Sequence, residues 1–106
     1  MEMIQQSEFE TLAVDIISLY NTLYNTPNYY KISNLEVVST LQDYNNFGYV
    51  LISRACIRNP DADIYDMVVD IQGQPMEALY KLHKELLATL EEEMPSEFKK
   101  RNLKLN

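Results

Sequence analysis

Apolar residues recur every three or four positions across residues 7–25, which predicts an amphipathic α-helix. Ser7 and Glu10 have the spacing of a capping box, so we expect the helix to begin at Ser7. The segment Asn25-Thr26-Pro27-Asn28 is expected to end it. The predicted apolar face consists of Phe9, Leu12, Ala13, Ile16, Ile17, Leu19, Tyr20, Leu23 and Tyr24.

A second helical pattern begins near Gln74 and Pro75 and runs to Pro95. Proline suits the first turn of a helix because its missing amide hydrogen has no partner there. Its apolar stripe consists of Met76, Leu79, Leu82, Leu86, Leu87, Leu90 and Met94. Residues 96–98 are expected to add at most a further short turn.

The middle of the chain, residues 33–72, predicts three antiparallel strands joined by two tight turns. Asn45–Gly48 and Asn59–Ala62 both have the composition of a type I turn followed by a left-handed residue. Closing the turns in this way pairs Val37 with Ile57 across the first hairpin, and Ile57 with Tyr65 across the second. Both registers place odd-numbered residues on one face of the sheet.

The two faces of the predicted sheet differ in polarity. The odd-numbered face, expected to form the core, carries Leu35, Val37, Leu41, Leu51, Ala55, Ile57, Tyr65, Met67, Val69 and Ile71. The even-numbered face mixes charged residues with Val38, Val50, Ile52, Cys56, Ile64 and Val68. Such an apolar patch is rarely left exposed in a monomer, so we expect a second copy, another protein or the C-terminal tail to cover it.

The order helix, three strands, helix predicts an α+β domain in which both helices pack on the odd-numbered face. The alternative is an all-α helical bundle, because Ser33 and Glu36 could cap a helix and Ile64, Val68 and Ile71 have helical spacing. Residues 1–98 are expected to form one compact domain, followed by a short basic C-terminal tail over residues 99–106.

Charge narrows the partners that we expect. The chain of 106 residues has 16 acidic and 9 basic residues and a net charge of −7, and four of the basic residues lie in the tail. Direct binding to nucleic acid is therefore disfavoured, because such binding depends on neutralising phosphates. An acidic body would attract a basic partner, although good solubility alone could account for the charge.

Cysteine content and hydropathy predict a cytoplasmic location. The single cysteine, Cys56, can form no internal disulfide. The first residues carry neither a positive segment nor an apolar stretch, so we expect no signal peptide. The longest apolar runs are about four residues, far below the ~20 needed to span a membrane.

Few residues have the pattern of a catalytic or metal site. His83, the one histidine, falls within the apolar stripe of the second helix, where we expect a buried ring or a pH-sensitive switch. The acidic group Asp61, Asp63, Asp66 and Asp70 lacks the spacing of a calcium loop and is expected to be solvated or paired across strands. We therefore expect no enzymatic activity, cofactor or metal.

Tyrosine is the unusual component, with eight residues and no tryptophan. Tyrosines that lie outside the core are enriched at protein interfaces, although many merely border a core. The candidate partner-binding residues are Tyr29, Tyr30, Tyr44, Tyr49, Asp66 and Asp70.

These features predict a small non-enzymatic binding protein, of the inhibitor, immunity-protein, adaptor or chaperone type. It would dock an acidic, tyrosine-bearing surface on a protein with a basic surface, and it could imitate nucleic acid in doing so. The alternative is a regulatory or ligand-binding subunit that uses His83. A homodimer through the even-numbered face is compatible with either function.

Overall fold

The protein has an α+β fold, as predicted, and the all-helical alternative is wrong. The computed structural model describes residues 2–45 and 48–105, with side chains over 8–45 and 48–101. The elements in chain order are α1 (Glu2–Leu23), the short 3-10 helix η1 (Ile32–Asn34), β1 (Leu35–Asp43), β2 (Tyr49–Arg58), β3 (Tyr65–Gln72), α2 (Pro75–Glu93) and α3 (Pro95–Leu105).

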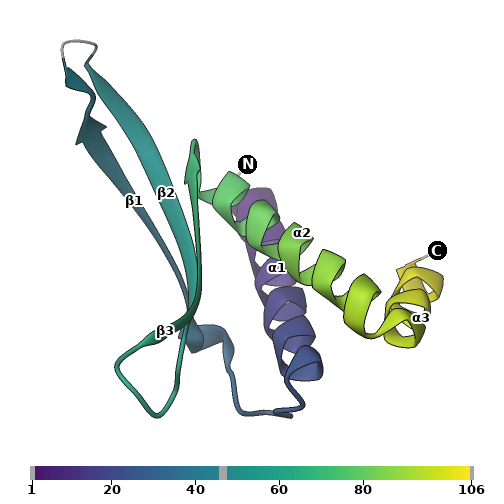
Figure 1. Ribbon diagram of the computed structural model, residues 1–106. Coiled ribbons are helices and arrows are strands. Elements are labelled where there is room, and N and C mark those ends of the chain that lie inside the picture. The colour runs from purple at the N-terminus through teal and green to yellow at the C-terminus, as the bar shows by residue number, and fades with distance from the viewer. Residues whose placement is uncertain (1, 46–47, 106) are drawn as a thin grey trace.

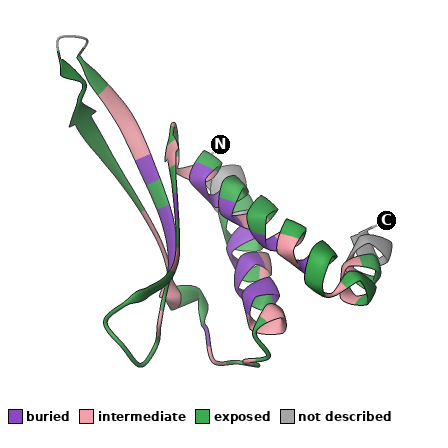
Figure 2. Cartoon of the chain, in the orientation of Figure 1, coloured by how far each residue is buried: buried purple, intermediate pink, exposed green. Residues whose placement is uncertain are grey.

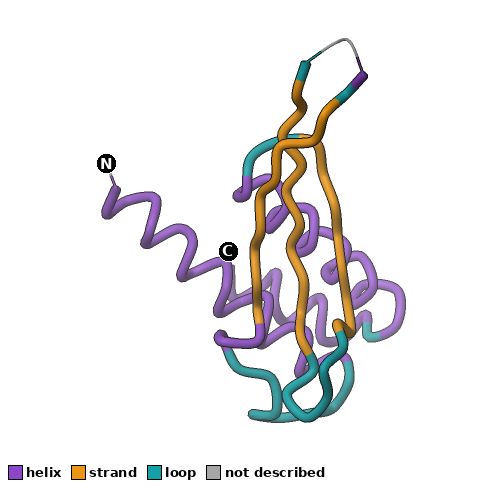
Figure 3. Tube along the Cα trace, turned by 90° about the vertical axis from the view of Figure 1, so that its left-hand side faces the viewer, coloured by secondary structure: helices purple, strands orange, loops and turns teal. Residues whose placement is uncertain are grey.

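The helices lie on one side of a three-stranded antiparallel sheet of order β1-β2-β3 (Figure 1; Figure 3). Helix α2 contacts all three strands, whereas α1 packs chiefly on α2 instead of lying beside it on the sheet. The core fills the space between α1, α2 and the sheet. Its fully buried large side chains include Ile16, Leu19, Ile57, Leu79, Leu82, Leu86 and Leu90.

The start of α2 agrees with the prediction, and the start of α1 does not. Pro75 occupies the first turn of α2, and the amide of Gln74 donates to Glu77 Oε1 at 3.2 Å. Helix α1 begins at Glu2, so Ser7 lies inside the helix and the predicted cap there is wrong. Apolar periodicity fixes the face of a helix, but the helix can extend beyond a cap-like pair when earlier residues also favour helix.

Both strand registers are displaced by two residues from the predicted ones. Val37 lies opposite Ala55, and Ile57 lies opposite Met67. Both connecting loops are longer than the predicted turns. Asp43 and Tyr49 are the last pair of the first hairpin, and its predicted turn falls partly on residues 46–47, outside the described residues. The second loop spans residues 59–64. A shift of two residues leaves every side chain on its predicted face.

A β-bulge in β3 is the exception to that pattern. The register changes between Ile57 and Arg58, so that Arg58 lies opposite Tyr65. The bulge turns Tyr65 away from the core. On the outer side of the sheet its hydroxyl donates to Glu36 Oε1 at 3.1 Å. The predicted core position of Tyr65 is therefore wrong, because an extra residue in one strand reverses the alternation beyond it.

We call the side of the sheet that faces α2 the helix face and the opposite side the solvent face. On the helix face Ala55, Ile57 and Val69 are buried, as predicted. Leu41 has the same alternation but is 69% exposed, because the β1–β2 hairpin extends past the end of the helices (Figure 2).

The residues predicted to form a basic tail belong to helix α3. Residues 99–105 continue that helix, and Arg101 Nη1 lies 2.6 Å from Asp15 Oδ1 of α1. Helix α3 packs on α2 and lies away from the sheet (Figure 1), so it does not cover the solvent face. Met94, directly before α3, and Phe98, within α3, pack against the core and attach this helix to the domain.

Candidate functional site

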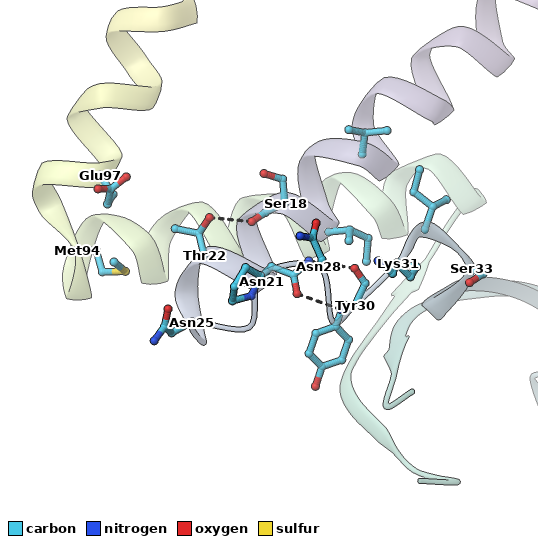
Figure 4. Close-up of a pocket in the computed structure, with 14 residues that line it drawn as sticks. Ser18, Asn21, Thr22, Asn25, Asn28, Tyr30, Lys31, Ser33, Met94 and Glu97 are labelled. Carbon is cyan, nitrogen blue, oxygen red and sulfur yellow. Dashed lines mark hydrogen bonds between the residues drawn. The ribbon is translucent and has the colours of Figure 1, made fainter. Parts of the chain in front are cut away.

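The loop after α1 is held in shape by one asparagine. Asn21 Oδ1 accepts the amide of Tyr30 at 3.1 Å, and Asn21 Nδ2 donates to the Tyr30 carbonyl at 3.0 Å (Figure 4). Asn25 and Asn28 adopt left-handed conformations with φ of 52° and 63°, which asparagine tolerates better than most residues. The loop therefore returns to the body of the domain and fixes the backbone of Tyr30.

Tyr30 is a core residue and not the exposed tyrosine that the sequence suggested. Its side chain is 7% exposed, and its ring packs edge-on against Tyr20 at 4.8 Å. Its hydroxyl donates to Asp66 of β3. Burial, together with that hydrogen bond, raises the pKa of Tyr30, so the phenol stays protonated and acts as a donor.

Tyr29, next to Tyr30, is half-buried and reaches the β2–β3 loop. Its hydroxyl lies 2.5 Å from Asp61 Oδ2 and 3.3 Å from Asn59 Oδ1. The hydrogen bond to Asp61 raises the pKa of Tyr29. Asn59 Nδ2 in turn donates to Asp66 at 3.0 Å. Tyr29, Tyr30, Asn59, Asp61 and Asp66 therefore form one connected group, which we call the tyrosine–aspartate network.

The network stands at the end of the molecule where the two loops meet, and its aspartates are exposed. The next acidic residue, Asp63, has a side chain that is 94% exposed and pairs with Arg58 Nη2 at 2.5 Å. Exposed carboxylates in fixed positions can accept charge-assisted hydrogen bonds from arginine or lysine. This end of the molecule is thus suited to contact a basic group.

The other candidate residues lie elsewhere. Asp70 is on the solvent face, where Arg54 binds it through two hydrogen bonds of 2.7 and 3.0 Å. This pair lowers the pKa of Asp70. Tyr44 and Tyr49 lie at the tip of the β1–β2 hairpin, 58% and 72% exposed. Of the six candidates, Tyr29, Tyr30 and Asp66 meet in the network, Tyr44 and Tyr49 lie at the hairpin tip, and Asp70 lies on the solvent face.

The solvent face is partly apolar, as predicted from its even-numbered residues. Val38 and Val68 are exposed and Cys56 is buried, whereas Ile64, which was predicted for this face, is exposed in the β2–β3 loop. Burial is the main cause that raises the pKa of the Cys56 thiol, which keeps it protonated. In the views of Figures 1 and 3, no described helix packs on this face.

His83 is half-buried and lies beside an acid that the sequence analysis did not connect with it. His83 Nε2 is 2.5 Å from Asp15 Oδ2, while Arg101 bonds the other oxygen of the same carboxylate. The hydrogen bonds from His83 and Arg101 outweigh burial and lower the pKa of Asp15. The group links α1, α2 and α3. It borders an open pocket of about 670 Å³, which Tyr80 also lines.

A second open pocket, of about 880 Å³, lies between the end of α1, its following loop and the start of α3 (Figure 4). Asn21 and Tyr30 line it on one side, and Met94 and Glu97 on the other. The Asn21 side chain, however, is already bonded to the Tyr30 backbone. The pocket is therefore a surface recess beside the loop that Asn21 fixes.

Among the side chains that the structure describes, those of residues 8–45 and 48–101, no group of three or more histidine, cysteine or acidic residues is placed to hold a metal ion. None of the helices described is both long and apolar enough to cross a membrane. Comparisons with protein-family models, with curated proteins and with solved structures each found no significant match.

Proposed function

We propose that this protein is a small acidic binding module that docks the tyrosine–aspartate network on a protein with a basic surface. The observation that carries the proposal is the connection of Tyr29 and Tyr30 to Asp61 and Asp66, which joins the loop after α1 to the β2–β3 loop and the start of β3. It supports a docking role because it presents ordered carboxylates at one end of the domain.

Order before binding favours affinity. A side chain that is already fixed loses little conformational entropy when a partner binds. Tyr29 is held by its bond to Asp61 and by its ring contact with Tyr30 at 5.0 Å. Asp61 is held in addition through its amide, which donates to Asn59 Oδ1 at 2.8 Å. The exposed carboxylates of the network therefore lose less conformational entropy on binding than freely rotating ones would.

The net charge of −7 acts in the same direction over a longer range. An acidic protein attracts a basic partner and accelerates their encounter, and added salt screens that attraction. In the narrower form of the proposal, the carboxylates occupy a cleft that otherwise binds the phosphates of nucleic acid. We propose a non-catalytic role in the cytoplasm, where the protonated thiol of Cys56 would remain reduced.

The test is affinity capture from a native lysate at low and high salt, with three forms of the full chain. They are the wild type, Asp61→Asn/Asp63→Asn, and the control Glu91→Gln/Glu92→Gln, which removes the same charge from the exposed end of α2. We expect the wild type and the control to retain a stoichiometric partner with a basic surface, and the loop variant to lose it.

Three results would count against the proposal. One is capture that the loop variant retains, and another is equal loss in the loop and control variants, which would make net charge alone responsible. The third is binding that is insensitive to salt, which would point to an apolar contact. Once a partner is purified, NMR shifts confined to residues 28–31 and 59–66 would locate the contact.

The second candidate function is binding of a small ligand at His83, and the open pocket beside the His83–Asp15 pair favours it. The measurement is an NMR titration of the His83 ring with and without candidate ligands. Ligand-dependent shifts of the ring resonances would support the site. Shifts confined to residues 28–31 and 59–66 would instead support the docking surface.

A further inference from the structure

We propose that two copies of this chain associate through the outer edge of β1, in antiparallel orientation, so that one continuous sheet crosses both copies. The proposal does not rest on the docking function, because it uses a different edge of the molecule and different residues. Four observations carry it: the direction of the backbone groups, the absence of edge protection, the self-complementary sequence and the exposure of Leu41.

The backbone of β1 presents unpaired hydrogen-bonding groups along its outer edge. The amide of Tyr44, the residue directly after β1, donates to the Gly48 carbonyl at 2.7 Å. Tyr44 and Gly48 continue the register of the strand pair, so the even-numbered residues of β1 direct their backbone N–H and C=O groups toward β2. Because backbone groups alternate along a strand, Val37, Ser39 and Leu41 direct their N–H and C=O groups outward. Among the described residues no strand pairs with this edge.

The two edges of the sheet differ in protection. At the β3 edge, Lys81 Nζ donates to the carbonyl of Asp70 at 3.2 Å, and the bulge at Tyr65 interrupts the strand. Charges and bulges of this kind keep edge strands from pairing with other chains. Strand β1 has an unbroken register from Leu35 to Asp43 and contains neither proline nor lysine. Its edge is therefore the one open to pairing.

The sequence of β1 is complementary to itself when two copies run antiparallel about Ser39. Val37 then lies opposite Leu41 of the second copy, and Glu36 lies opposite Gln42 of the second copy. The pairs at the ends are Leu35 with Asp43. No like charges face each other, which matters because like charges directly opposite destabilise a sheet.

The exposed side chain of Leu41 provides apolar surface that the second copy would bury. Leu41 is on the helix face but beyond the helices, and it is 69% exposed. In the antiparallel pair it meets Val37 of the second copy, which lies in the part of the sheet that the helices cover. Association thus buries apolar surface that the isolated chain leaves in water.

The test is the oligomeric state of the full chain by sedimentation, over a range of concentration and salt. We expect a concentration-dependent dimer that salt strengthens, because screening weakens the repulsion between two chains of charge −7. This salt dependence is opposite to that expected for the basic partner, so the two proposals can fail separately.

Two matched variants locate the interface. Leu41→Lys places a charge at the proposed edge, and Val68→Lys places the same charge on the solvent face, where Val68 is 45% exposed. Both positions are exposed, so we expect both variants to fold. We expect Leu41→Lys to weaken dimerisation at least about tenfold and Val68→Lys to leave it unchanged.

A cross-link tests the register. Two Ser39 residues lie directly opposite in the proposed dimer, at a distance that a disulfide can bridge. Ser39→Cys in a Cys56→Ala background should form a covalent dimer on oxidation, whereas Gln72→Cys at the β3 edge should not. A monomer at all concentrations, no cross-link at Ser39, or dissociation by Val68→Lys but not by Leu41→Lys would overturn the proposal.

Discussion

The two ends of the β1–β2 hairpin share one ladder of hydrogen bonds but have different surroundings. Near the start of β1, Val37 and its partner Ala55 lie under α2 and join the core. Further along the same two strands, Leu41 and its partner Leu51 continue the same alternation, yet Leu41 is mostly exposed. Alternation therefore fixes the direction of a side chain, whereas the length of the neighbouring helix layer decides whether it is buried.

Truncation in the covered part should have the largest effect. Ile57→Ala removes a side chain that is fully buried, and we expect it to lower the free energy of unfolding by about 2–5 kcal/mol. Urea unfolding followed by circular dichroism measures this loss. A loss below about 1 kcal/mol would show that this part of the hairpin is no better packed than the tip.

Ser53 lies between the two parts and should have the next largest effect. Its buried hydroxyl donates to the Gly73 carbonyl at 2.7 Å and lies 2.7 Å from the hydroxyl of Ser39. We expect Ser53→Ala to cost about 1–3 kcal/mol in urea unfolding, because it leaves the Gly73 carbonyl without this donor. Ser39→Ala, at a more exposed position, is the control, and an equal loss in both variants would contradict this explanation.

A substitution at Asp15 tests whether the contact between α1 and α3 stabilises the domain. Its carboxylate bonds both His83 and Arg101, so we expect Asp15→Asn to lower the free energy of unfolding at pH 7 by ~1 kcal/mol, since the group is partly exposed. Glu10→Gln, at an exposed acid of the same helix, should change it less.

The same carboxylate predicts a direction for the pH dependence. The folded pKa of Asp15 lies below its ordinary value of 3.8, so its contribution is complete above that pH. It is lost as the pH falls through the lower folded pKa. The difference in unfolding free energy between wild type and Asp15→Asn should therefore shrink under acid conditions. A difference that grows there would contradict the lowered pKa of Asp15.

The smallest effect is expected at the tip. Leu41→Ala should change the free energy of unfolding by no more than about 0.5 kcal/mol in dilute solution, where the proposed dimer would dissociate. The measurement is the same urea titration as for Ile57→Ala, on a side chain that points to the same face. A loss comparable to that of Ile57→Ala would mean that the tip is covered in solution.

Sequence patterns predicted the order of α1, the three strands and α2, the place of Pro75 in the first turn of α2, and the face of most strand residues. These features depend on local periodicity and on the chemistry of single residues, which a sequence displays directly. They did not predict the two-residue shift of both registers, because loop length depends on how the chain returns to the sheet. The reversal of Tyr65 needed knowledge of the bulge, for which no residue such as glycine gave a signal.

The candidate site was predicted only in part. Tyr29, Tyr30 and Asp66 were named, but no local pattern connects them, since 36 positions separate Tyr30 from Asp66. Asn21 and Asn59, which hold the network, were missed because asparagine near a helix end or in a loop usually signals a turn alone. The contact between Asp15 and Arg101 was not predicted because it depends on how α3 packs.

The meander also has a consequence for the order in which the protein folds. Its strands are joined by short loops, so each pairing closes a small segment of chain and loses little entropy. Helix α1, in contrast, rests on α2, which follows only after the whole sheet. The hairpins are therefore expected to form in the early steps of refolding, and α1 to dock late. Pulse-labelling hydrogen exchange would show amides of β2 protected before those of α1.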